Sequence, residues 1–150
     1  MPAEVAAAAR GAGVFGEIRI EGGKGEEELV CAAKASAEPA EFRVYAEGGK
    51  VWVALTTRAR WLSQSIEADL VHTGDKVEEL LEEELVNLGW AMPLGGPGYK
   101  PTFEHFRDKQ KRYTFRTPVP KADAQTVAAF LLAYEAAFRP LGDMEADGEE

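Results

Sequence analysis

The chain has little of what most reactive sites are built from. Its 150 residues include one cysteine, two histidines and three serines. Cys31 stands alone, so no internal disulfide can form, which fits a reducing cytoplasm. None of the serines lies in a Gly-x-Ser-x-Gly elbow, and the two histidines are far apart in the sequence. We therefore expect no catalytic residue, no metal site and no bound cofactor.

Long apolar runs and positive charge are also scarce. No apolar segment approaches the roughly 20 residues of a membrane span, and Glu4 stands where a signal peptide would carry positive charge. The formal net charge is −9 and the pI is about 4.8, so nucleic acid and anionic membranes would repel the surface. These features predict a cytoplasmic protein that binds neither nucleic acid nor membrane.

The chain does contain a β-hairpin whose residue pairing can be predicted from the sequence. Residues 41–57, EFRVYAEGGKVWVALTT, are two alternating runs joined by Gly48-Gly49. Gly-Gly supplies the positive φ angles of a two-residue primed turn. The pairing then runs from Glu47 with Lys50, through Tyr45 with Trp52, to Phe42 with Leu55. Aliphatic side chains share one face, and Tyr45 and Trp52 meet on the other, where they are either core or a binding site.

Other segments follow the same logic. Residues 14–20, 29–35 and 113–119 alternate as strands do, and Pro118 and Pro120 mark the last of these as an edge strand or its end. Residues 75–88 and 123–138 show the i, i+3, i+4 apolar stripe of amphipathic helices, and Asp123 is the expected N-cap of the second. Residues 58–72 fit a helix or a strand, and we favour a strand that continues the meander. Residues 91–102 are rich in Pro and Gly and form a loop.

These elements predict an α+β fold, with a mostly antiparallel twisted sheet of about five strands packed by two amphipathic helices. Val44, Val53, Leu81 and Leu131 are expected to share its interior. Length and composition fit one such domain over residues 13–141. It is preceded by a flexible Ala-rich arm at 1–12 and followed by a disordered acidic tail at 142–150.

Positive charge is concentrated in residues 104–121, against an otherwise acidic chain. Such a band either pairs internally with acidic segments or docks an acidic partner segment or a phosphorylated ligand. Together with the aromatic pair of the hairpin, it supplies the candidate binding residues Tyr45, Trp52, Arg107, Lys109, Lys111, Arg112 and Arg116.

The residues at hand resemble the secretion-chaperone group, including its YbjN-type domains. The resemblance covers residues 41–140 and is carried by the small size, the low pI, the hairpin, the acidic helix at 75–88 and the closing unit YTFRTPVPKADAQTVAAFLLAYEAAF. It implies a twisted antiparallel sheet flanked by helices and frequent dimerisation. It has no diagnostic motif and implies no site residue, and the extra hairpin at 14–35 departs from it.

The sequence therefore favours a non-enzymatic adaptor or chaperone-like module that binds a protein partner and forms a possible homodimer. Its partner would dock on the sheet surface or an open strand edge. The alternative is a small-molecule-binding protein or an enzyme. Such a protein would work in a cleft near the 91–106 loop, using His105, Arg107 or Tyr99.

Overall fold

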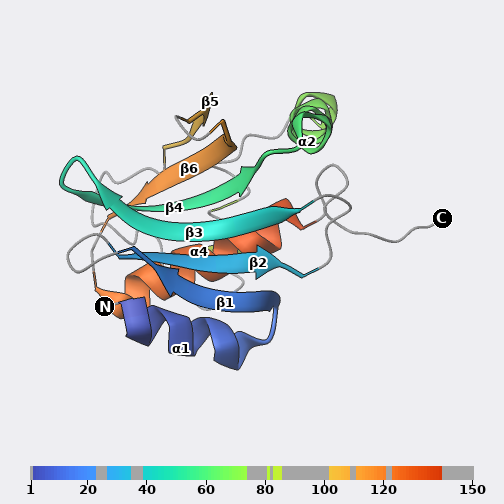
Figure 1. Ribbon diagram of the computed structural model, residues 1–150. Coiled ribbons are helices and arrows are strands. Elements are labelled where there is room, and N and C mark those ends of the chain that lie inside the picture. The colour runs from blue at the N-terminus through green and yellow to red at the C-terminus, as the bar shows by residue number, and fades with distance from the viewer. Residues whose placement is uncertain are drawn as a thin grey trace.

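A computed structural model describes residues 2–22, 27–34, 39–73, 81, 83–85, 102–108, 111–120 and 123–139; for Pro2 and residues 69–73 only the backbone is described. Six antiparallel strands form one open sheet in the order β1-β2-β3-β4-β6-β5 (Figure 1). The strands are β1 Phe15–Glu21, β2 Glu28–Ala33, β3 Ala40–Glu47, β4 Lys50–Thr57, β5 Glu104–Arg107 and β6 Tyr113–Val119. The predicted α+β class and antiparallel sheet are confirmed.

Helices α1 (Pro2–Ala12) and α4 (Ala124–Phe138) pack together on one face of this sheet (Figure 1). We call this the helical face, and the opposite side of the sheet the second face. Val44, Val53, Leu81 and Leu131 belong to one buried cluster, as predicted. Aliphatic side chains are worth about 1.5–3 kcal/mol each when fully buried, so this cluster fixes which side of each strand faces inward.

The hairpin of β3 and β4 has the predicted register at every pair from Glu47–Lys50 to Phe42–Leu55. Gly48 and Gly49 have φ angles of 62° and 79°, which is the left-handed conformation that the two-residue turn requires. The start of α4 is also as expected, since the Asp123 carboxylate accepts a hydrogen bond from the Thr126 amide at 2.8 Å.

Residues 58–72 correct the prediction of a strand, because they form helix α2 (Arg60–Thr73). The Thr57 hydroxyl, at the end of β4, accepts a hydrogen bond from the Ala59 amide at 3.0 Å, and the helix begins directly after it. Leu62 and Ile66 are fully buried one turn apart, while Trp61 is exposed. The apolar residues of this segment fit both the helical period of 3.6 residues and the strand period of two, so the sequence alone could not decide between a helix and a strand.

The Ala-rich start also differs from the expected flexible arm. Residues 2–12 form α1, which buries Val5, Ala6 and Ala9 against the rest of the core. Three-residue and four-residue spacings place these side chains on one helix face, and the small alanines let α1 lie close to α4. The apolar stripe was missed because alanine contributes little to a hydrophobic pattern.

The sixth strand was not expected. Residues 104–107, which begin just after the predicted 91–102 loop and overlap the end of the 91–106 segment, pair with β6 as β5. β5 begins at Glu104, which lies opposite Arg116 of β6. Pro118 lies beyond this point, where β6 pairs only with β4, so its missing N–H interrupts no pairing with β5. Of the predicted 75–88 helix, residues 81 and 83–85 are described and are helical, with Leu81 and Leu85 buried. The 142–150 tail, residues 91–101 and Lys109 lie outside the described residues.

Candidate binding face

The second face carries a row of charge that crosses the whole sheet. No described helix packs on it: α1 and α4 lie on the helical face (Figure 1), and the buried residues of α2 and of residues 81 and 83–85 belong to the same core cluster. The strand registers place one residue from each strand at the same level, in the order Arg19, Val30, Arg43, Ala54, Arg116 and Glu104. Three arginines therefore alternate with two apolar residues, and a glutamate ends the row at β5.

Carboxylates around the row neutralise its arginines. Arg43 is only 6% exposed, donates to Thr56 and pairs with Glu41 and with Glu28, the latter at 3.2 Å. Arg19 donates to the same Glu41 at 2.8 Å. Although burial opposes its ionisation, the Glu41 carboxyl has a lowered pKa because Arg19 hydrogen-bonds to it and the charge of Arg43 lies beside it.

Val30 and Ala54, between the arginines of the row, are fully buried. Arginine has a long aliphatic stem that can cover neighbouring apolar side chains while its head stays polar. The ion-paired arginines thus shield the apolar residues of the second face from solvent. The surface of this face consists of charged groups that are held in place by their ion pairs.

Arg116, like Arg43, is a nearly buried cation of this face. It is 8% exposed, donates from Nε to Glu104 at 3.0 Å and from Nη1 to Glu47 at 2.9 Å and to the Tyr45 hydroxyl at 3.2 Å. Its guanidinium carbon lies 3.8 Å from the centre of the Trp52 ring. Burial disfavours the charge, but the hydrogen bonds to Tyr45, Glu47 and Glu104 keep the pKa of Arg116 above its ordinary value. Arg116 therefore links β3, β5 and β6 through its Nε and Nη1 donors.

The aromatic pair of the hairpin divides into two roles. Trp52 is 6% exposed, and its indole N–H donates to the Glu47 carbonyl at 3.0 Å. It belongs to the packed layer beneath Arg116. Tyr45 is half-buried, and burial raises the pKa of its phenol, which therefore stays protonated at neutral pH. Its oxygen accepts from Arg116, so its own O–H is left to donate.

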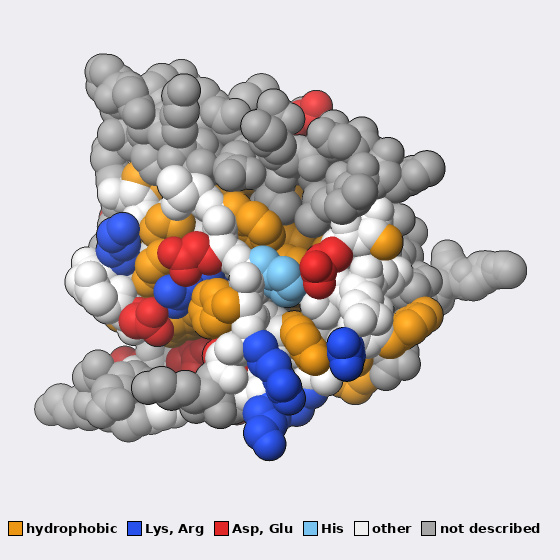
Figure 2. Space-filling model, turned by 90° about the horizontal axis from the view of Figure 1, so that it is seen from above, with side chains coloured by type: hydrophobic (Ala, Val, Ile, Leu, Met, Phe, Trp, Pro, Cys, Tyr) orange, Lys and Arg blue, Asp and Glu red, His pale blue; other side chains and the backbone are white. Residues whose placement is uncertain are grey.

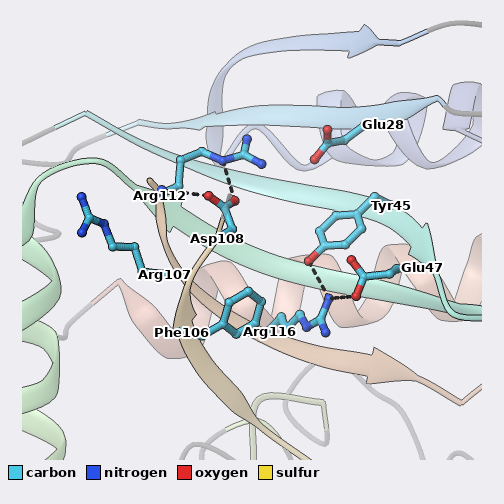
Figure 3. A pocket seen from close by; sticks show the side chains of 8 residues that line it. All are labelled: Glu28, Tyr45, Glu47, Phe106, Arg107, Asp108, Arg112 and Arg116. Carbon is cyan, nitrogen blue, oxygen red and sulfur yellow. Dashed lines mark hydrogen bonds and ion pairs between the residues drawn. The ribbon is translucent and has the colours of Figure 1, made fainter. Parts of the chain in front are cut away.

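A hollow of about 510 Å³ opens on this face (Figure 3). Tyr45, Arg107, Arg112 and Arg116, four of the seven predicted site residues, line it together with Glu28, Glu47, Phe106 and Asp108. The sequence missed Phe106, Glu28 and Glu47. Their alternation with core residues along β5, β2 and β3 was the available signal, but β5 itself was not recognised.

The turn between β5 and β6 forms the basic end of the hollow. Arg112 donates from Nε to Asp108 at 2.8 Å, so this part of the basic band is neutralised within the turn. Arg107 is exposed, its guanidinium carbon lies 5.7 Å from the centre of the Tyr113 ring, and its side chain points away from the hollow (Figure 3). Lys111, at φ 63°, is exposed as well and does not line the hollow. Neither Arg107 nor Lys111 forms an ion pair within the described part of the chain. Internal pairing, one of the two predictions for the band, applies to Arg112 and Arg116. Docking of an acidic partner, the other prediction, would need cations such as Arg107 and Lys111.

Arg112 also borders a second hollow, of about 600 Å³, nearer to β1. Arg19, Glu41, Arg43 and Arg58 contribute to its lining. Because Arg112 borders both hollows, they lie next to each other on the same face of the sheet. Together the two hollows make the second face concave in part, whereas the face of a flat sheet would not be.

His105 does not belong to this face. Its ring stacks on Phe115 of the core at 3.9 Å, its Nδ1 lies 3.0 Å from the Thr114 carbonyl, and its Nε2 lies 3.1 Å from Glu67 of α2. Each ring nitrogen of His105 thus lies against an oxygen acceptor. His105 joins β5 to α2, and it lines neither hollow described above.

The open edges of the sheet are poor docking sites. β1 has an irregular register between Phe15 and Ile18, and β5 is four residues long. Short or bulged edge strands pair badly with added strands. Figure 2 looks onto the β5 side and shows acidic, basic and apolar side chains interleaved over its described part.

Comparison of the chain with protein-family models, with curated proteins and with solved structures finds no match. The resemblance noted from the sequence is supported only at the level of the α+β fold and its antiparallel sheet. Within the described residues, no cluster of three or more potential metal ligands occurs, and no helix is long and apolar enough to cross a membrane.

Proposed function

We propose that this protein is a non-enzymatic binding module whose partner is a polypeptide segment that docks on the second face. The observation that carries the proposal is the hollow, where aromatic and basic side chains from β3, β5 and β6 meet on the side of the sheet opposite α1 and α4 (Figure 3). A chaperone-like role of this kind is also what the resemblance to secretion chaperones implies.

The face is favoured over the edges for a physical reason. Added strands need a long regular edge, and β1 and β5 are irregular or short. The hollow instead offers the rings of Tyr45 and Phe106 beside charged groups held by internal bonds. Pre-ordered side chains lose little conformational entropy on binding, which favours recognition.

An enzyme or small-molecule site near the 91–106 segment has less support. His105, its expected base, uses both ring nitrogens in bonds to Thr114 and Glu67. Arg107 lines the hollow on the second face, and Tyr99 lies outside the described residues.

The test is affinity capture from native lysate with three forms of the protein, each checked for folding by circular dichroism: wild type, a Tyr45→Ala/Phe106→Ala double variant and an Arg10→Glu control. Arg10 is exposed on α1, away from the second face. We expect one or more proteins to be captured by the wild type and the control and lost with the double variant. Solution mass measurement of the free protein shows in parallel whether it self-associates. Equal capture by all three forms would contradict the proposal.

A further inference from the structure

We infer that the hollow of about 510 Å³ recognises the main chain of its polypeptide segment, binding the N–H and the C=O of one residue through Glu47, Tyr45 and Arg116. The inference rests on the proposed function and specifies how the partner is bound. It follows from hydrogen-bonding groups around Arg116 that the fold itself leaves unused.

The Arg116 guanidinium has one nitrogen without an acceptor. Its Nε donates to Glu104 and its Nη1 donates to Tyr45 and Glu47, but its Nη2 forms no hydrogen bond among the described residues. Arg116 is only 8% exposed, and it lines the hollow. Buried donors almost always have an acceptor, so the two N–H groups of Nη2 indicate a place for one.

Tyr45 and Glu47 complete the set of unused groups. Both are bonded to Nη1 of Arg116, at 3.2 and 2.9 Å, so they lie next to each other (Figure 3). The Tyr45 oxygen accepts its bond, which leaves the O–H to donate. The Glu47 side chain is 60% exposed and uses only Oε2, which leaves Oε1 to accept. Lys50, opposite Glu47 in the hairpin, lies over the Trp52 ring at 5.8 Å and forms no ion pair within the described residues.

The other charged groups of the lining are engaged elsewhere. Glu28 pairs with Arg43 at 3.2 Å, and Asp108 binds Nε of Arg112 at 2.8 Å. The side chain of Arg107 points away from the hollow (Figure 3). Recognition in the hollow therefore depends on the two donors and the acceptor around Arg116.

These groups favour a ligand that is neutral and that both accepts and donates. An acidic group would accept from Tyr45 and Arg116 but would meet the carboxylates of Glu47 and Glu104, which already surround this arginine. A basic group would pair with Glu47 but would offer no acceptor to the buried Nη2. Like-charge contacts penalise the first and an unpaired buried donor penalises the second. An amide carries both a carbonyl oxygen and an N–H, so it satisfies all of these groups.

The main chain supplies such groups at every residue other than proline. In an extended segment the N–H and the C=O of one residue point to the same side, as they do in a hydrogen-bonded pair of antiparallel strands. The N–H donates to Oε1 of Glu47, and the C=O accepts from the Tyr45 O–H and from Nη2 of Arg116. The ring of Phe106, also in the lining, covers the segment from the β5 side. Binding of this kind depends little on the side chains of the segment.

The inference is tested with random 12-residue peptides displayed on phage and selected on the folded full-length protein. One enriched peptide is synthesised with capped ends, and each of its main-chain amides is replaced in turn by an ester, which removes the N–H. We expect the ester at one position to raise Kd about tenfold or more, as for the loss of a hydrogen bond to a charged acceptor. With the Glu47→Ala protein the same ester should change Kd by less than about twofold, because the acceptor is gone.

Tyr45→Phe removes the O–H but keeps the ring, and it should raise the Kd of the unmodified peptide roughly fivefold. Tyr113→Phe is the matched control, because Tyr113 lines neither hollow, and it should leave Kd unchanged. Circular dichroism checks that each variant is folded.

An ester scan without a sensitive position, an equal ester effect with the Glu47→Ala protein, an unchanged Kd with Tyr45→Phe, or no enrichment would each overturn the inference. Loss of lysate capture with Tyr45→Ala/Phe106→Ala in any of those cases would leave the proposed function standing.

Discussion

Replacing Trp52 by alanine tests whether the aromatic pair of the hairpin is part of the packed structure. Trp52 is 6% exposed, contacts Arg116 with its ring and donates its indole N–H to the Glu47 carbonyl. Truncation of a buried tryptophan typically costs 3–5 kcal/mol, and here the arginine also loses the ring it lies on. We expect a loss of about 3–5 kcal/mol in the free energy of unfolding.

For a chain of this length the unfolding entropy is roughly 0.3 kcal/mol per kelvin, so the loss corresponds to a fall in Tm of about 10–16 °C. Urea titration followed by circular dichroism, together with a thermal scan, measures both quantities. Trp61→Ala is the matched control, because Trp61 is 54% exposed and should change stability by no more than about 0.5 kcal/mol. A Trp52→Ala protein within 1 kcal/mol of the wild type would refute the view that this ring is core.

Three further predictions concern Arg116, Cys31 and Glu41. Arg116→Lys keeps the positive charge but loses the planar guanidinium that reaches Glu104, Glu47 and Tyr45. We expect the free energy of unfolding, measured by urea titration, to fall by roughly 1–3 kcal/mol. Arg107→Lys, at an exposed position, should leave it nearly unchanged. Burial raises the pKa of the Cys31 thiol to about 12, so at pH 8 the native protein should react with a thiol reagent on the order of a thousandfold more slowly than the urea-unfolded chain; comparable rates would contradict this burial. The Glu41 carboxyl has a lowered pKa in the folded state, so its contribution to stability is present above pH 4.5, the ordinary pKa of the group, and disappears as the pH falls through the lowered value. Glu41→Gln should therefore flatten the dependence of the unfolding free energy on pH below that point, and an unchanged slope would show that the contacts with Arg19 and Arg43 do not hold in solution.

The hairpin shows how far sequence reasoning reaches. Its register depended only on the alternation of side chains and on Gly48-Gly49, both local properties, and each predicted pair is present. The cap at Asp123 and the buried stripe of α4 were equally local. In contrast, α2 was assigned wrongly, because residues 58–72 fit both the helical and the strand period, and β5 was missed, because four residues are too few to show a period.

The candidate site was predicted in part. Tyr45, Arg107, Arg112 and Arg116 were chosen for their chemistry, and the structure brings them to one hollow. Nothing in their spacing showed that Arg116 would be buried and bonded to Glu47, Glu104 and Tyr45 while Arg107 forms no ion pair among the described residues. Lys109 stays a prediction, since it lies outside the described residues.

The sequence by itself determined the periodic elements, the turn glycines and the interior shared by Val44, Val53, Leu81 and Leu131, because burial of apolar side chains follows directly from their pattern. Only the tertiary structure decided that β6 lies between β4 and β5, which places Arg116 beside Trp52 and level with Ala54 and Glu104. Ion pairs between strands depend on which strands are neighbours and in what register, and these are properties of the assembled sheet.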